Sequence, residues 1–239
     1  MLTSSTPVAA PIAVDTAWCA ACFEAVRWHE TRDLAAEIYA ISFAEDGQSG
    51  GSFGAMQNDC HASGRALSVF TGILLAAKMP IDQRGRVIGL VAAAQRSDPL
   101  SPADRAAVNA ALESVQGRAA VDQLDQSVFR LLLPQLDRCI AAAAANGGAA
   151  IATDAAMGMA IWINASGAPS TLLRWLGGEP VIEHAGRPAL VARGQVIDQA
   201  AFTAYLALTL EFSRSPRYIE AMTEAMAIGL AKLPPVIAA

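Results

Sequence analysis

The chain has 239 residues, of which 54% are hydrophobic and only 16% are charged. A chain of this length can bury a substantial core, and its alanine-rich composition favours packed helices over a disordered chain or a strand-rich sandwich. The net charge is −5 without any cluster of Lys or Arg, which argues against nucleic acid or an anionic membrane as the main partner. The longest apolar runs are shorter than the ~18 residues that suggest a membrane span.

Residues 1–14 are rich in Ser, Thr, Pro and Ala, and we expect them to form a flexible lead-in to a single domain over residues 15–239. They lack the basic start and the compact apolar core of a secretory signal. A first helix is expected over residues 15–28. Apolar spacing predicts a second helix over residues 31–45, with Glu45 as its last residue.

The segment 46–59 contains three glycines before Phe53 and is expected to be a loop. Further helices are predicted over 61–78 and from Pro80 to about Ala94. Helical pattern then runs from Ser101 to about Asn146, with a break near Gly117 and a kink or interruption at Pro134. The remaining helices are predicted over 150–163, from Ser170, over 198–213 and over 216–232. The segment 180–197 could form a small β-hairpin or an irregular loop. The fold class is therefore mainly α, with about nine or ten helices.

The four cysteines give two interpretations. Cys19 and Cys22 lie three residues apart on an expected helix, and Cys60 and Cys139 are isolated in the sequence. Cys19, Cys22, Cys60 and His61 could form a zinc site, but the sequence has no second Cys-x-x-Cys and no paired histidines, so buried reduced thiols are favoured. A disulfide from Cys60 to Cys19 or Cys22 is the alternative. The sequence predicts no cofactor and no metal.

Glu45 has features that suit acid catalysis on a sugar. Cleavage of a glycosidic bond needs a carboxylic acid that stays protonated near neutral pH. The end of a helix disfavours negative charge, and nearby apolar side chains would raise the pKa further by desolvation. These side chains are Tyr39, Phe43 and Phe53. The alternative is that Glu45 is a solvated residue at a helix end.

The loop after Glu45 carries groups that suit a polysaccharide. Its glycines, at positions 50, 51 and 54, would allow a close approach of the backbone. Its polar side chains could hydrogen-bond to sugar hydroxyls and N-acetyl groups; they are Ser49, Ser52, Gln57 and Asn58. A purely structural loop of the same composition is the alternative.

Two short segments resemble the lysozyme-like superfamily. Glu45 followed by Gly-Ser-Phe-Gly-Ala-Met-Gln (51–57) is similar to the catalytic glutamate and Gly-x-Met-Gln segment of lytic transglycosylases and related muramidases. Residues 161–178, with Asn164 and the run Ser-Thr-Leu-Leu, resemble phage-type endolysins. The resemblance implies a lysozyme-like helical domain in which Glu45 is the general acid, Gln57 shapes the cleft, and Asn164 anchors the substrate or a loop.

A second carboxylate would set the stereochemistry of the reaction. Asp59 is the candidate, as a base for water or as an electrostatic stabiliser, and its alternative is to cap the helix expected over 61–78. Without a second acid, the site could still act as a lytic transglycosylase. Trp162 could stack on a sugar ring or belong to the core. The predicted substrate-binding residues are thus Ser49, Ser52, Phe53, Gln57, Asn164 and Trp162.

The sequence therefore predicts a glycosidase that cleaves peptidoglycan, as a muramidase or a lytic transglycosylase. It would act in the cell wall or periplasm after export by a route that needs no secretory signal. One alternative is a chitosanase- or chitinase-like enzyme on another amino sugar polymer, since the net charge of −5 suits a cationic substrate. The other is a non-catalytic binding or structural protein with the same fold.

Overall fold

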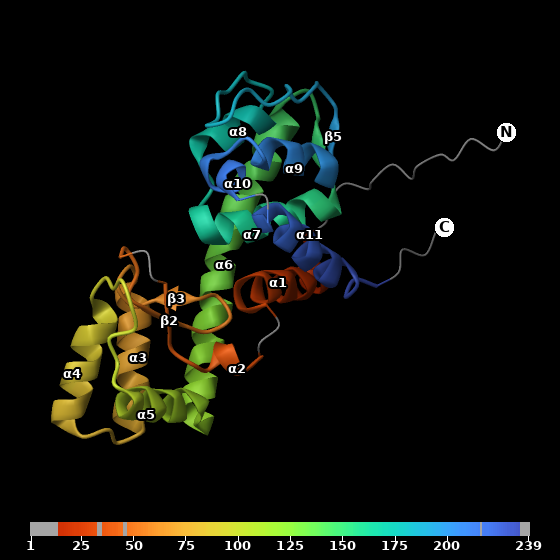
Figure 1. Ribbon diagram of the computed structural model, residues 1–239. Helices are drawn as coiled ribbons and strands as arrows, with labels where there is room; N and C mark the ends of the chain where they lie inside the picture. The colour runs from red at the N-terminus through yellow and green to blue at the C-terminus, as the bar shows by residue number, and fades with distance from the viewer. Residues whose placement is uncertain (1–13, 33–34, 45–46, 216, 235–239) are drawn as a thin grey trace. The chain divides into compact units, whose positions relative to one another are not determined.

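The computed structural model describes residues 14–32, 35–44, 47–215 and 217–234 (Figure 1). Most of them are helical and the two sheets are small, which confirms the mainly-α class. The chain divides into two compact units, one of residues 30–130 and one of residues 1–29 with 131–239. The lead-in predicted over residues 1–14 lies almost wholly outside the described residues, and the single domain over 15–239 stays a prediction.

The unit of residues 30–130 joins a three-stranded antiparallel sheet to a group of helices. The strands lie in the order β1 (Ser42–Phe43), β2 (Gly51–Phe53) and β3 (Asn58–Asp59). The helices are α2 (Ala35–Ile38), α3 (Gly64–Ala76), α4 (Ile81–Ala92), α5 (Pro102–Glu113) and the first part of α6 (Val115–Ala145). Helix α3 packs against α4, α5 and β3, and Figure 1 shows α3 and α4 side by side.

Two glycines at the start of β2, Gly50 just before it and Gly51 as its first residue, bring the sheet against helix α4. A Cβ atom at Gly51 would lie 2.7 Å from Val91 Cγ1, and one at Gly50 would lie 2.4 Å from the Val91 carbonyl oxygen. Phe53 is fully buried, with its ring centroid 5.8 Å from that of Phe70 on α3. These glycines were predicted to let a polymer approach the backbone closely. At positions 50 and 51 it is helix α4 of the protein itself that lies close to the backbone.

Local signals set several helix ends. Ser101 caps α5 by accepting a hydrogen bond from the backbone of Asp104, and Pro102 is the first helical residue, as predicted. The break between α5 and α6 falls at Ser114, close to the predicted position. Of the kink or interruption predicted at Pro134, the interruption is wrong, because α6 continues through it, and the kink stays a prediction. Pro134 is exposed, and buried leucines two positions to either side hold the helix in place.

The other unit is built around helix α7 (Thr153–Ser166), whose residues 155–163 are all buried. It packs against α9 (Gln199–Leu206) and α11 (Arg217–Leu230). A Cβ at Gly229 of α11 would lie 2.4 Å from Met157 Sδ and 2.8 Å from Ala25 Cβ, so glycine allows α11 to contact both α7 and α1. The remaining helices are α1 (Thr16–Thr31), the rest of α6, α8 (Ser170–Leu176) and α10 (Leu210–Arg214).

The segment 180–197 forms no hairpin of its own. Its last residues form β5 (Val196–Ile197), which pairs in parallel with β4 (Ala150–Ile151), and a single bridge joins Glu183 to Gly186. The helix predicted over 198–213 is divided into α9 and α10. Within the described ranges, no helix combines the length and the apolar character that crossing a bilayer requires.

Candidate functional site

The helix predicted over residues 31–45 does not continue past Ile38 in the part that the structure describes, and Glu45 itself lies outside the described residues. Helix α2 ends at Ile38, and residues 42–43 are strand β1. The Ile41 N–H donates to Asn109 Oδ1 at 3.0 Å, and the Ile41 carbonyl accepts from Arg105 Nη1 at 2.9 Å. These bonds to α5 replace the bonds that would continue the helix. A helix that runs through residues 42–43 to position 45 is therefore excluded.

The three side chains expected to surround Glu45 with apolar surface have other partners. The guanidinium of Arg118 lies 4.7 Å from the Tyr39 ring centroid, and that of Arg105 lies 5.9 Å from the Phe43 ring centroid. Phe53 is fully buried in the core. Its ring packs against Phe70 and joins the sheet to α3, and a contact between Phe53 and substrate stays a prediction.

A buried carboxylate anchors the Gly-Ala-Met-Gln turn between β2 and β3. Asp125 of α6 accepts from the Ala55 N–H at 2.7 Å, the Met56 N–H at 3.2 Å and Asn58 Nδ2 at 2.6 Å. Its exposed fraction is 1%. Burial raises the pKa of Asp125 to about 6, although the three hydrogen bonds oppose this rise. Asp125 thus fixes the backbone of the motif that carries the resemblance.

Asp125 is not among the residues predicted for the site, although the sequence contains a signal for it. Val121, Leu124 and Val128 mark an apolar face at helical spacing, and Asp125 falls on the same face. An acid at such a position must be paired or hydrogen-bonded when buried. Its partners lie about seventy residues away in the sequence, so local pattern could not identify them.

Gln57 follows the anchored turn and contributes polar atoms beside the sheet. Its backbone has a φ of +46°, and its side-chain Nε2 donates to the Gly54 carbonyl at 3.1 Å. Its Oε1 accepts from Ser42 Oγ at 3.0 Å, and Ser42 is exposed. Ser52 is mostly buried, and Ser49 is half-buried with its carbonyl accepting from the Gln95 N–H at 2.9 Å. Ser42 and Gln57 therefore form the accessible polar pair of this sheet.

Asp59 organises the loop rather than capping α3. Its Oδ1 accepts from the Gly50 N–H at 3.0 Å and from the His61 N–H at 2.7 Å. Ser63 caps α3 by accepting from the Ala66 N–H, so the helix-cap interpretation of Asp59 is wrong. Among the described residues Asp59 Oδ2 makes no hydrogen bond. Its role as the second carboxylate stays a prediction.

Trp162 and Asn164 belong to the other compact unit. Trp162 is only 4% exposed, and its ring centroid lies 6.2 Å from that of Phe202 and 5.8 Å from that of Tyr205. It is mainly a core residue, as the alternative interpretation held. Asn164 is half-buried on α7. Its predicted position opposite Glu45 stays a prediction.

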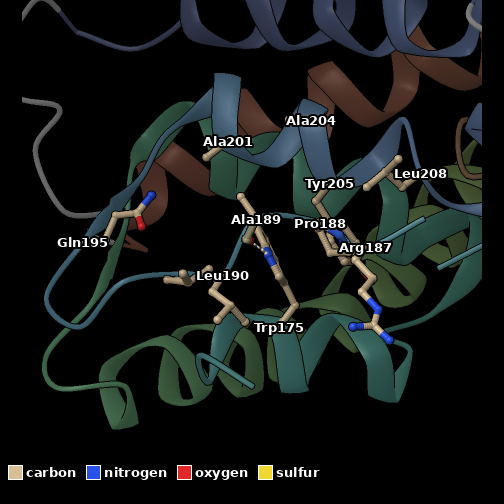
Figure 2. A pocket seen from close by; sticks show the side chains of 11 residues that line it. Trp175, Arg187, Pro188, Ala189, Leu190, Gln195, Ala201, Ala204, Tyr205 and Leu208 are labelled. Carbon is tan, nitrogen blue, oxygen red and sulfur yellow. Dashed lines mark hydrogen bonds between the residues drawn. The ribbon is translucent and has the colours of Figure 1, made fainter. Parts of the chain in front are cut away.

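An apolar pocket of about 230 Å³ lies between α8, α9 and residues 187–191 (Figure 2). The indole of Trp175 stacks on the Tyr205 ring, with centroids 4.5 Å apart and an interplanar angle of 24°. Trp175 Nε1 also donates to the Ala189 carbonyl at 2.8 Å. Figure 2 shows Arg187 at the edge of the pocket. These contacts fasten the loop to the helices, and the lining offers no acid–base pair for catalysis.

The four cysteines are free thiols, and three of them are buried. Burial raises the pKa of Cys60 and of Cys139 to about 12 and raises that of Cys22 even further. In the part of the chain that the structure describes, no three His, Cys, Asp or Glu side chains converge on a point where a metal ion could bind. The thiols therefore act as small apolar core groups.

Comparison of the chain with protein-family models finds no match, and the same is true of comparisons with curated proteins and with solved structures. The resemblance to the lysozyme-like superfamily thus rests on the residues of the two motifs.

Proposed function

We propose that this chain is a glycosidase that cleaves peptidoglycan, as a muramidase or a lytic transglycosylase, with Glu45 as the general acid. The observation that carries the proposal is the turn between β2 and β3. The Gly-Ala-Met-Gln segment that follows Glu45 in the sequence is held by two backbone hydrogen bonds to Asp125, and the side chain of the next residue, Asn58, makes a third. A motif held by a buried carboxylate gives fixed positions to the polar groups beside it, which catalysis requires.

The residues of the proposed site have distinct roles. Glu45 donates its proton to the glycosidic oxygen as the bond to the leaving sugar breaks. Ser42 and Gln57, which are hydrogen-bonded to each other at 3.0 Å, bind sugar hydroxyls or an N-acetyl group. In a hydrolase, Asp59 Oδ2 activates water or stabilises the developing positive charge. In a transglycosylase, the 6-hydroxyl of the sugar attacks instead, and no second carboxylate is needed.

Clearing of a suspension of purified cell walls tests the role of Glu45. Glu45→Gln has nearly the same shape but no proton to donate, so we expect the rate to fall by about 10²–10⁴-fold. Glu37→Gln is the matched control, because Glu37 is an exposed acid of the same unit. Circular dichroism and thermal unfolding check that both variants are folded. Equal clearing by wild type and Glu45→Gln removes Glu45 from the mechanism.

Mass spectrometry of the products separates the two reactions. Products with 1,6-anhydro ends identify a transglycosylase, and products with reducing ends identify a hydrolase. Asp59→Asn should slow only the hydrolase. The net charge of −5 favours a cationic polymer as a second candidate substrate, so soluble chitosan oligomers are tested in parallel. A folded wild-type chain that cleaves neither polymer is instead a non-catalytic binding or structural protein.

A further inference from the structure

A second cavity, of about 420 Å³, opens in the unit of residues 1–29 and 131–239, beside Trp162. Its volume lies in the range of small-molecule pockets, about 300–1,000 Å³. Its polar lining comes from α7, α8, α10 and the loops between helices. The residues are Ser166, Thr171, Glu183, Thr209, Glu211 and Arg214.

Most of this lining presents hydrogen-bond acceptors. The hydroxyl of Ser166 donates to the Trp162 carbonyl at 2.8 Å, and that of Thr209 donates to the Leu206 carbonyl at 2.7 Å. Because these hydrogens already have acceptors, the two hydroxyls offer lone pairs to a ligand. The carboxylates of Glu183 and Glu211 add further acceptors. A ligand that fits this lining must be rich in donors.

Glu183 is held in position before any ligand binds. Its Oε1 accepts from the Tyr205 hydroxyl at 2.5 Å, and Tyr205 packs between the rings of Trp162 and Trp175. Glu183 is half-buried, whereas Glu211 is exposed and has no ion-pair partner among the described residues. A fixed carboxylate beside an indole suits a cation, since an ammonium ion has three donors and is attracted to the face of an aromatic ring.

Arg214 gives the cavity a second recognition element of opposite charge. Its guanidinium is exposed and makes no ion pair within the described ranges. Guanidinium groups have only donors and match the geometry of a carboxylate. The cavity therefore combines acceptors for a cation with a donor group for an anion, which together fit a molecule that carries both charges.

We propose that this cavity binds a zwitterion, namely a free amino acid. Its ammonium group lies against the carboxylates of Glu183 and Glu211, and its carboxylate pairs with Arg214. Trp162 contributes the apolar wall. The site belongs to one compact unit and does not depend on the proposed glycosidase activity.

Isothermal titration of the full chain with L-lysine tests this site. We expect L-lysine to bind at least about tenfold more tightly than hexanoate, which lacks both ammonium groups, and hexylamine, which lacks the carboxylate and the α-ammonium. Glu183→Gln and Arg214→Gln should each weaken L-lysine about tenfold or more, because each removes a charge-assisted hydrogen bond. Glu183→Gln keeps an acceptor for Tyr205, and Arg214→Gln changes an exposed residue, so both should stay folded.

Glu224→Gln is the matched control, because Glu224 is an exposed acid of α11 that does not line the cavity. It should leave the affinity for L-lysine unchanged. The proposal is overturned by no binding of L-lysine at about 10 mM, by equal weakening in the Glu224→Gln control, or by hexanoate or hexylamine binding as tightly as L-lysine.

Discussion

Replacement of Asp125 with alanine would show how strongly one buried carboxylate holds the turn between β2 and β3. The substitution removes the acceptor of three donors that lie 2.6–3.2 Å from the Asp125 oxygens. A buried donor without an acceptor costs about 1–3 kcal/mol. We therefore expect Asp125→Ala to lower the free energy of unfolding by at least about 3 kcal/mol at pH 4, where the carboxyl group of the folded protein is protonated.

The loss of unfolding free energy caused by Asp125→Ala should decrease as the pH rises. Burial raises the pKa of Asp125 in the folded protein from an ordinary 3.8 to about 6, so between these values the folded state binds more protons than the unfolded state. The protonated carboxyl group of Asp125 stabilises the folded state fully below pH 3.8, and this stabilisation is lost as the pH rises through 6. The full change corresponds to roughly 3 kcal/mol, of which roughly 2 kcal/mol falls between pH 4 and pH 7. The alanine variant lacks this dependence.

Urea unfolding of wild type and Asp125→Ala at pH 4, 5.5 and 7 measures both effects, because other titrating groups cancel in the difference. Asp122→Ala is the matched control. Asp122 is an exposed acid of the same helix whose Oδ1 accepts from the Tyr39 hydroxyl at 2.8 Å, so its loss should cost about 1 kcal/mol. A difference for Asp125→Ala that stays constant or grows as the pH rises would contradict the raised pKa of Asp125 in the folded protein.

Two further substitutions and one labelling experiment test the packing. Gly54→Ala should destabilise by about 2 kcal/mol or more, because φ is +84° and the new Cβ would lie 2.5 Å from Asp125 Oδ1. Gly72→Ala, on α3 with no atom within 4 Å of the new Cβ, should stabilise by about 0.5–1 kcal/mol, and urea unfolding measures both. With a thiol reagent at pH 8, Cys19 should react first, and rapid labelling of a buried thiol in the folded chain would contradict the structure. The buried thiols are Cys22, Cys60 and Cys139.

Features with local causes could be read from the sequence. Ser101 and Pro102 begin α5 because a serine side chain accepts from the helix N-terminus and proline needs no hydrogen bond there. The glycines at 147 and 148 follow the end of α6 with φ of +63° and +81°, which glycine adopts without strain. The mainly-α class also follows from local sequence patterns. The same local information marks the Gly-Ala-Met-Gln segment as part of a loop.

The fold of the segment around that motif depends on contacts with residues that are distant in the sequence. The apolar spacing of residues 31–45 predicts a helix, but hydrogen bonds from Ile41 to Asn109 and Arg105, more than sixty residues away, turn the chain into a strand. The partners of Asp125 and the parallel pairing of β4 with β5 also join distant residues. Spacing along the chain reports which face of an element is apolar. It does not report which distant donor or acceptor forms a hydrogen bond with that element. Here those long-range hydrogen bonds determine the geometry of the candidate site.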